Sequence, residues 1–514
     1  MGRWQKYYPF FAAALLLYVA LLIIYPHYQY YIDPDGTAYL TISKRYAAGD
    51  IQRAINGYWS PWACWLTAGL IRCGFAAIPA SVIINTLGAT GFLFISQSFF
   101  LKFGIIRKTQ WLLDITLAFF LCYAIFWQSF DDLWECFFLL CTLRVMLAES
   151  FKHKPGLWVL TGLIGTLAYF AKAYSFPFFI LNTICCTFFI TKDNKALWLK
   201  MSFVSIGTMI LCSLPWVWAL HDKYGIWTTS TSGSLNMSWY LVGHPHWKAG
   251  IDVLLPPPYP DSPYYWEDPW FVNGDTPHFW DSWHLLGLQI LRLGYNVFKL
   301  LRSMLQLSIV FPLIAIAAWL SFRSGKWSAL FVGDMKIVIL SFLLFPLGYL
   351  LVNFESRYIW YMLPLGMVMV ALWLQNNSGK SRQRLLLILV LISFLVYPVW
   401  QMRNMYDEGS NEHIVTEQLR EMNIQGSFAS ITKAGPEVQR TERLAYFSGN
   451  QFYSVGTKNV SEKNLLKEMS RYHVKYYFTF DTSHSGNFVD EGERPLPVII
   501  KGSIEGLKVF QFNQ

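Results

Sequence analysis

A short acidic run near the N-terminus contains residue types that can perform acid–base chemistry. Asp33 and Asp35 stand in a stretch with one proline and one glycine, so the backbone is restricted to a turn that projects two carboxylates at one place. A carboxylate within hydrogen-bond reach of a hydroxyl can act as its general base. The alternative interpretation is structural, a solvated turn in which Asp35 caps a helix over 37–48 that ends at Gly49.

A second set of side chains stands at the ends of apolar stretches that are far apart in the sequence. The set comprises Asp131, Asp132, Glu135, Lys172, Tyr174, Glu355, Arg357 and Tyr358. Ionisable groups at membrane depth are costly unless they are paired or functional.

Apolar stretches of membrane-spanning length must position these residues. The chain has 514 residues, of which 54% are hydrophobic and only 14% charged, whereas a soluble domain would carry about 25% charge. About 20 apolar residues cross the hydrocarbon core of a bilayer. We predict a polytopic α-helical membrane protein with about eleven transmembrane helices. The spans lie at about 9–26, 80–101, 110–128, a fourth returning to Lys152, 157–172, 175–191, 198–220, 303–321, 336–353, 358–375 and 385–400.

The charges between the spans predict the orientation of the chain. Short loops rich in lysine and arginine favour the cytoplasmic side, which places the N-terminus inside and the C-terminus outside. The acidic loop ends then fall outside. The net charge of +9 is explained by the inner loops and requires no nucleic-acid partner. We expect an integral membrane protein of a bacterial inner membrane, with its candidate site on the periplasmic face.

Three regions outside the spans complete the predicted organisation. Residues 1–400 form the transmembrane module, which includes a first outer segment over 27–79 and a large outer loop over 221–302. The first outer segment is expected to contain two interfacial helices, over 37–48 and about 62–71. Residues 401–514 are expected to form a small extracytoplasmic α/β domain. Its predicted helices are 414–422 and 461–471, and its predicted strands 428–431, 474–480 and 507–512.

These motifs resemble those of the GT-C superfamily of glycosyltransferases that use polyprenyl-phosphate sugars. The likeness is to the branch that contains the protein O-mannosyltransferases and the lipid A aminoarabinose transferase. Asp35 through Tyr39 is similar to the acidic motif that opens the first outer loop in that branch, which implies that Asp35 is the catalytic aspartate. Residues 59–62 resemble its proline-containing entry to an interfacial helix, residues 355–358 its Arg-Tyr motif, and Lys172 its lysine after span five.

Two departures from the pattern change the expected roles. Many relatives carry Lys-Pro-Pro before the second interfacial helix, with the lysine on the donor phosphate, whereas this chain has Ser60 followed by proline. Phosphate binding is therefore expected from Lys172, Arg357 and Arg53. The glutamate that usually follows the first-loop aspartate is also missing, so Asp33 becomes the reserve base.

The resemblance implies transfer of a sugar from a polyprenyl phosphate to an acceptor hydroxyl by a single inverting displacement. The donor is a lipid-linked sugar, the acceptor a glycan, lipid or protein, and the surroundings are membrane lipids. The residues expected to support Asp35 are Tyr39, Asp132, Glu135, Tyr174, Glu355 and Tyr358. No cofactor is required, although some relatives use a divalent cation, for which Asp33 with Asp132 is a candidate pair. His244 and His246 are a weaker metal-ligand pair, because no acidic residue or cysteine is spaced to complete it.

Three rival classes remain open from the sequence. A transporter or lipid flippase would also be polytopic, but it usually contains internal repeats and charges near the midplane. A glycan polymerase or ligase would need outer cations without requiring an acid in the first loop. A non-catalytic scaffold of envelope assembly would need neither. The aromatic stretch over 264–270 is either a sugar-stacking surface or a packed cover over the site.

Overall fold

A computed structural model describes residues 4–127, 131–192, 194–243, 254–272, 276–323, 333–377, 379–430, 436–455, 462–480 and 507–512. The chain forms two compact units. The first, which we call the helical unit, comprises Met1–Pro26, Ser60–Ser230 and Gln289–Tyr406. The second, the mixed unit, comprises His27–Trp59, Thr231–Leu288 and Asp407–Gln514. The first outer segment and the large outer loop are therefore largely grouped with the C-terminal segment.

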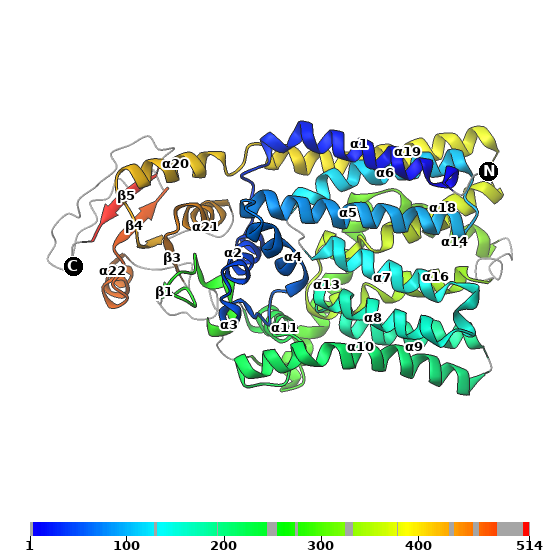
Figure 1. Ribbon diagram of the computed structural model, residues 1–514, viewed down its shortest axis with the longest axis horizontal. Helices are drawn as coiled ribbons and strands as arrows, with labels where there is room; N and C mark the ends of the chain where they lie inside the picture. Colours follow the sequence, from blue (N-terminus) through cyan, green and yellow to red (C-terminus); the bar gives the residue numbers. More distant parts are fainter. Residues whose placement is uncertain are drawn as a thin grey trace. The chain divides into compact units, whose positions relative to one another are not determined.

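The helical unit is built from apolar helices (Figure 1). They are α1 (Tyr8–Ile24), α4 (Pro61–Arg72), α5 (Ala77–Lys102), α6 (Arg107–Phe126), α7 (Asp132–Met146), α8 (Pro155–Ala171), α9 (Ser175–Thr191), α10 (Lys195–Tyr224), α13 (Trp283–Leu307), α14 (Val310–Arg323), α16 (Met335–Leu344), α17 (Leu347–Val352), α18 (Met362–Asn377) and α19 (Lys380–Met405). Among the described residues, six helices are long and apolar enough to span a membrane, or seven if one bent pair counts as a single span. The chain is thus a polytopic membrane protein.

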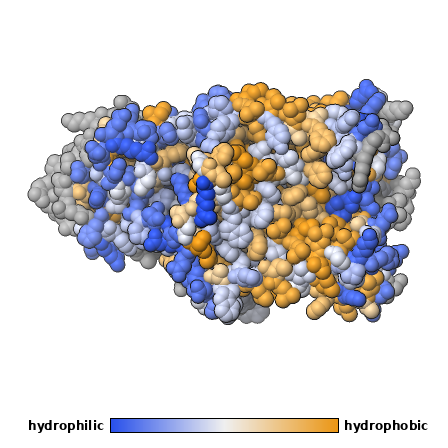
Figure 2. All heavy atoms as spheres, viewed as in Figure 1, coloured by the Kyte–Doolittle hydropathy of each residue, from blue (hydrophilic) through white to orange (hydrophobic). Residues whose placement is uncertain are grey.

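Every predicted span coincides with a helix or a pair of helices, but the number eleven stays a prediction. The reason is length, because α7, α8, α9 and α18 contain 15, 17, 17 and 16 residues, fewer than the ~20 that cross a bilayer perpendicular to its plane. Figure 2 shows hydrophobic side chains, in orange, over the helices of the helical unit. This exposed apolar surface is expected where lipid replaces water.

The predicted span over 303–321 is wrong in its shape. The structure breaks it between α13 and α14, whose axes are bent by 105°. Pro312 lies at the third position of α14, so it lacks an N–H for the helix ladder and its ring clashes with the carbonyl of Ser308 four residues earlier. Pro312 therefore disfavours a continuous helix at this point, although α10 and α19 continue through Pro215 and Pro398. The structure also differs from the prediction at the start of α13, which begins at Trp283, inside the predicted outer loop.

The mixed unit contains a five-stranded sheet in the order β1-β3-β2-β4-β5. The strands are β1 (Leu254–Leu255), β2 (Ser427–Ser430), β3 (Gln451–Val455), β4 (Tyr476–Thr479) and β5 (Lys508–Gln511). Strands β3, β2 and β4 are parallel, and the edge strands β1 and β5 are antiparallel. The helices of the C-terminal segment are α20 (Ser410–Glu421), α21 (Pro436–Ser448) and α22 (Glu462–Arg471). Helices and strands alternate in the described part of this segment, and the small extracytoplasmic α/β domain stays a prediction.

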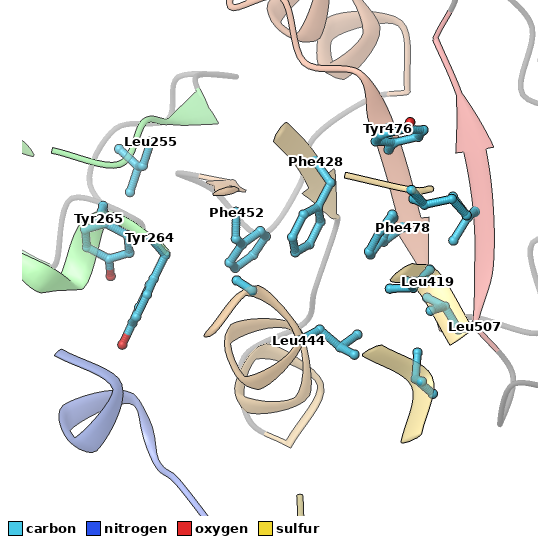
Figure 3. Packing of buried hydrophobic residues seen from close by; sticks show 14 residues of the cluster. Leu255, Tyr264, Tyr265, Leu419, Phe428, Leu444, Phe452, Tyr476, Phe478 and Leu507 are labelled. Carbon is cyan, nitrogen blue, oxygen red and sulfur yellow. The ribbon is translucent and has the colours of Figure 1, made fainter. Parts of the chain in front are cut away.

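Stacked aromatic rings form the centre of this sheet (Figure 3). The ring of Phe428 stacks on Phe478 at 4.2 Å and on Phe452 at 5.3 Å between centroids. Leu444 of α21 and Leu419 of α20 are fully buried against them. Since each buried phenylalanine or leucine contributes roughly 1.5–3 kcal/mol, this core holds α20 and α21 firmly on the sheet.

The first outer segment contributes α2 (Pro34–Ala48) and α3 (Ile51–Ala54) to the mixed unit. Gly49 ends α2 in the left-handed region, at φ 83°, as predicted. Residues Gly36 to Ser43 are all buried, and so is Arg45. This burial on every side of α2 differs from the one-sided burial predicted for an interfacial helix. The helix predicted at 62–71 is α4.

Candidate functional site

Lys172 and Arg357 lie at one end of the helical unit and share a buried carboxylate. Lys172 follows the last residue of α8, and Arg357 lies in a short 3-10 helix, Ser356–Ile359, between α17 and α18. Asp132 begins α7 and is only 1% exposed. Lys172 Nζ contacts Asp132 Oδ1 and lies 3.5 Å from Asp131 Oδ2, and Arg357 Nε lies 3.5 Å from Asp132 Oδ2. Two cations are thus held together by one carboxylate.

Aromatic rings form one wall of this cluster. Tyr174, Tyr349 and Tyr358 stack in a row, with centroid separations of 3.7 Å and 4.0 Å. The ammonium group of Lys172 lies 4.7 Å from the ring centre of Tyr358, within the range of a cation–π attraction. The cation–π contact holds the lysine in addition to the hydrogen bond that its Nζ donates to Asp132.

Glu135 lies one turn along α7 and is anchored by hydroxyl groups. Ser175 donates to Glu135 Oε1 at 3.0 Å, and Tyr349 donates to Oε2 at 3.2 Å. The carboxyl group is 1% exposed. Glu135 therefore connects α7, α9 and α17. Its hydrogen bond from Tyr349 fixes the middle ring of the three stacked tyrosines.

The cluster continues from Arg357 to the polar face of α13. Arg357 Nε lies 2.9 Å from Glu355 Oε2, and the Asn353 amide donates to Glu355 Oε1 at 3.4 Å. Arg292 and Lys299 of α13 both donate to Asn353 Oδ1, at 2.7 Å and 3.1 Å. This connection was missed by sequence reasoning, although the two cations are seven residues apart and so share one face of a helix.

Ser60 stands where the resemblance leads one to expect a lysine, and its hydroxyl contacts the chain next to Lys172. Ser60 is the N-cap of α4, but its hydroxyl makes no capping bond. It accepts a hydrogen bond from the N–H of Ala173 at 3.2 Å. Ser60 therefore lies beside the backbone of the residue that follows Lys172, the C-cap of α8.

The acidic turn lies in the mixed unit, and the structure reverses the predicted roles of its two aspartates. Asp33, not Asp35, is the N-cap of α2, because Asp33 Oδ1 accepts from the N–H of Gly36 at 2.7 Å. Proline at the following position suits the first helical turn. Asp35 lies in the first turn of α2, half-buried, and its Oδ1 accepts from Trp266 Nε1 at 3.1 Å.

An aromatic cluster surrounds Asp35 within the mixed unit. Trp266 stacks on Trp239 at 5.5 Å, and Tyr58 meets Trp266 edge-on at 5.3 Å. Trp59 donates from Nε1 to the carbonyl of Trp266 at 2.9 Å and meets Tyr39 edge-on at 5.1 Å. The predicted supporting residue Tyr39 belongs to α2, is 2% exposed, and stabilises this cluster through its contact with Trp59.

Arg53, a predicted phosphate ligand, belongs to a separate ion network. It lies 3.7 Å from Asp50 and 3.5 Å from Asp261. The centre of the network is Arg45, which is 4% exposed and bonds Glu267 at 2.5 Å and Asp261 at 2.8 Å. Partial burial raises the pKa of Asp261, but the hydrogen bonds and charge of Arg45 outweigh this and hold that pKa below its ordinary value. The network ties α2 to the large outer loop.

The structure thus brings most of the predicted residues into two groups. The helical unit gathers Asp131, Asp132, Glu135, Lys172, Tyr174, Glu355, Arg357 and Tyr358, and the mixed unit holds Asp33, Asp35, Tyr39 and Arg53. Among the described residues, no group of three or more His, Cys, Asp or Glu side chains could hold a metal ion. His244 and His246 lie outside the described residues.

The two groups have complementary chemical capacities. A lysine and an arginine in a largely dehydrated setting can stabilise an oxyanion more strongly than water can. An aspartate beside indole and phenol rings can accept a proton next to a surface that suits a sugar ring.

Comparison with solved structures identifies the architecture. Neither a protein-family model nor a curated protein matches the sequence. The crystal structure of ArnT from Cupriavidus metallidurans bound to undecaprenyl phosphate aligns with a TM-score of 0.59 at 12% identity, covering 99% of this chain and 98% of ArnT. Its apo form aligns with a TM-score of 0.54 at 11% identity, covering 97% of each chain. The apo oligosaccharyltransferase of Archaeoglobus fulgidus reaches a TM-score of 0.48 at 11% identity, over 93% of this chain and 70% of its own. The protein therefore has the fold of ArnT along almost its entire length.

Proposed function

We propose that the protein is a membrane glycosyltransferase that moves a sugar from a polyprenyl-phosphate donor to an acceptor hydroxyl. The observation that carries the proposal is the sharing of buried Asp132 by Lys172 and Arg357 in a chain with the ArnT fold. ArnT was solved with undecaprenyl phosphate bound, which supports a lipid of this class as the donor carrier. The predicted orientation makes the periplasmic face of a bacterial inner membrane the place of reaction.

The cations supply the phosphate side of the reaction. When the bond between the anomeric carbon and the phosphate oxygen breaks, the phosphate retains the electron pair and gains negative charge. Arg357 and Lys172 stabilise this charge, because they are fixed in advance and only 13% exposed. Ser60 lies beside Lys172 through Ala173, so lysine from α8 performs the role that relatives give to a lysine before α4.

Asp35 supplies the acceptor side. Asp33 Oδ1 caps α2, whereas Asp35 lies in the first turn of α2 and is oriented by the indole N–H of Trp266. It accepts the proton of the acceptor hydroxyl as the acceptor oxygen attacks the anomeric carbon. The displacement has one step and inverts the anomeric configuration. Trp266 and Tyr58 present half-buried rings beside Asp35, a surface against which a sugar ring can stack.

The test is release of undecaprenyl phosphate by the purified full-length protein in lipid nanodiscs. A panel of synthetic undecaprenyl-phosphate sugars, hexoses and pentoses, is incubated with a membrane extract as acceptor source, and the lipid product is separated by chromatography. We expect Arg357→Gln and Lys172→Met each to lower the rate by about 100-fold, the scale of removing one oxyanion donor. Asp35→Asn should lower it by about 10²–10⁴-fold.

Matched controls are available on exposed helix positions. Arg403→Gln in α19 and Lys200→Met in α10 change the same residue types at exposed positions, and they should retain wild-type rates. Full activity of Asp35→Asn at unchanged expression would remove Asp35 as the base. Movement of the intact lipid-linked sugar across proteoliposomes without bond cleavage would identify a flippase instead.

A further inference from the structure

The acidic turn is held by the C-terminal segment through a buried arginine. Arg443 of α21 is 2% exposed and donates from Nη1 to the carbonyl of Ile32 at 3.4 Å. Its Nη2 donates to Glu408 Oε1 at 2.7 Å. The guanidinium group therefore connects the residue before Asp33 to the start of the C-terminal segment, and its planar fork fixes the direction of both contacts.

Glu442, the neighbour of Arg443, faces the same turn. It is 5% exposed, and its Oε2 has no hydrogen-bond partner among the described residues. Asp33, Asp35, Arg443, Tyr264 and Tyr265 all interact with it electrostatically. Burial raises the pKa of Glu442 well above its ordinary value, and the charge of the two aspartates adds to this. A buried carboxyl oxygen without a hydrogen-bond partner among the described residues is thus packed beside the turn.

Further contacts extend this attachment on both sides of the turn. Upstream, the N–H of Asp407 donates to the carbonyl of His27 at 2.9 Å, and the ring of Tyr30 lies 4.3 Å from that of His413. Downstream, the ammonium group of Lys44 lies 4.0 Å from the ring centre of Tyr446. Tyr264, in Figure 3, donates to the carbonyl of Pro34 at 2.7 Å. The segment from His27 to Lys44 is therefore seated along α20 and α21.

We propose that the C-terminal segment sets the position of the candidate base, with Arg443 and Glu442 of α21 as positioning residues that act through the Asp33–Asp35 turn. This inference rests on the proposed function, since it assigns α21 a role in the same reaction. Neither residue is a candidate for contact with the substrate. Their effect is on the geometry of Asp35, and a misplacement of about 1 Å can cost about 100-fold in rate.

The first experiment separates positioning from binding by steady-state kinetics of polyprenyl phosphate release. Arg443→Met should lower kcat by about 10–100-fold with KM for the donor lipid within about twofold of wild type. Glu442→Ala should behave in the same way, and Glu442→Gln should restore most of kcat because the amide has the shape of the carboxyl group that it replaces. Arg471→Met and Glu417→Gln, both exposed in the same segment, should be unchanged. Unchanged kcat in Arg443→Met and Glu442→Ala would overturn the inference.

The second experiment needs no activity and keeps the two proposals distinguishable. Deuterium exchange reports on the N–H groups of Gly36 and Thr37, which are bonded to Asp33 in the turn. Arg443→Met and Glu442→Ala should raise their exchange while the amides of β2 and β4 stay protected. If β2 also loosens in Arg443→Met, Arg443→Lys takes its place, because a lysine cannot reach both Ile32 and Glu408.

The outcomes differ for the two proposals. Unchanged exchange in the turn overturns the positioning role, whatever the activity of the wild type. Faster exchange together with a wild-type protein that cleaves no lipid-linked sugar overturns the proposed function and leaves the attachment of the turn to α21 standing.

Discussion

At the scale of single residues, Asp132 is the group through which the two candidate phosphate ligands are connected. A fully buried carboxylate between two cations is costly to remove, because both cations lose their partner in a medium of low dielectric constant. The same arrangement keeps Lys172 and Arg357 close together before any substrate arrives. Sequence reasoning placed these residues at helix ends, and their shared sidedness followed from the charges of the loops.

Asp132→Asn should therefore destabilise the protein by about 3–5 kcal/mol. The measurement is thermal unfolding in detergent micelles, followed by tryptophan fluorescence. Asp334→Asn is the matched control, because Asp334 pairs with Lys102 at 2.8 Å but is 44% exposed, and it should cost less than about 1 kcal/mol. Equal effects of the two substitutions would contradict the importance of burial at Asp132.

Glu442 predicts a pH dependence of stability with a definite sign. Its pKa is raised in the folded protein above the ordinary value of 4.5, so above that pH the folded state binds more protons than the unfolded state. The free energy of unfolding must then fall as pH rises towards the raised pKa. Glu442→Gln cannot ionise, so its stability relative to wild type should increase as the pH rises above about 5. A constant difference between the two unfolding curves would contradict the prediction.

Some residue-scale features could not be read from the sequence. Asp33 and Asp35 both fit a helix cap, and only the backbone geometry decides between them. Arg45 and Glu267 are 222 positions apart, and no local pattern reports such a pairing. Ser60 likewise contacts Ala173 only because α4 and α8 pack together.

At the scale of elements, α8 packs against α10 through a close backbone approach. A Cβ at Gly162 would lie 2.4 Å from the carbonyl oxygen of Ser205 and 2.6 Å from Cβ of Thr208. Small residues let helices in membranes approach in this way. Because α8 ends at Ala171, this packing also sets the position of Lys172.

Gly162→Ala should displace α8 and lower both stability and polyprenyl phosphate release. A cost of about 1–3 kcal/mol is expected, the usual scale of overpacking, as measured by thermal unfolding. Gly156→Ala lies in the same helix with nothing within 4 Å of its added Cβ, and it should be neutral or slightly stabilising because alanine favours helix. A destabilisation of Gly156→Ala as large as that of Gly162→Ala would show that propensity, not packing, decides.

Gly409 offers a second element-scale prediction, at the junction of α20 with the first outer segment. Its φ is +90°, and an added Cβ would lie 2.1 Å from the carbonyl oxygen of Tyr30. Gly449 has a φ of +73° with nothing within 4 Å, so alanine there meets only backbone strain. Gly409→Ala should therefore lower the unfolding temperature more than Gly449→Ala, and it should speed deuterium exchange near Tyr30. Equal effects would exclude the steric clash.

The hydropathy of the sequence does not predict the short elements and the bends of the fold. The apolar run over 303–321 is continuous, although Pro312 interrupts the helix. Helix α21 and strand β3 were not predicted, and strand β1 has only two residues. Longer periodic elements such as α20 and α22 were predicted to within a few residues, because their apolar spacing recurs over several turns.

At the scale of the whole molecule, the distribution of basic loops predicts the topology. Lys152 lies after α7 in a loop expected inside, and Asn423 lies in the C-terminal segment expected outside. In intact cells, a membrane-impermeant maleimide should label Asn423→Cys and leave Lys152→Cys unlabelled until the membrane is opened. The comparison requires a background without the exposed native cysteines Cys73 and Cys212. The opposite labelling pattern would contradict the predicted orientation.

The pairing of β1 with β3 joins residue 254 to residue 455, and this has a consequence for biogenesis. During synthesis, β1 leaves the ribosome about 200 residues before its partner strand β3. The separation between α2 and α21 along the chain is larger still. Contacts of such sequence separation form late. The candidate base is therefore seated only after the last segment has been made and translocated. On the proposed function, a chain released before α21 is made would therefore lack a positioned base.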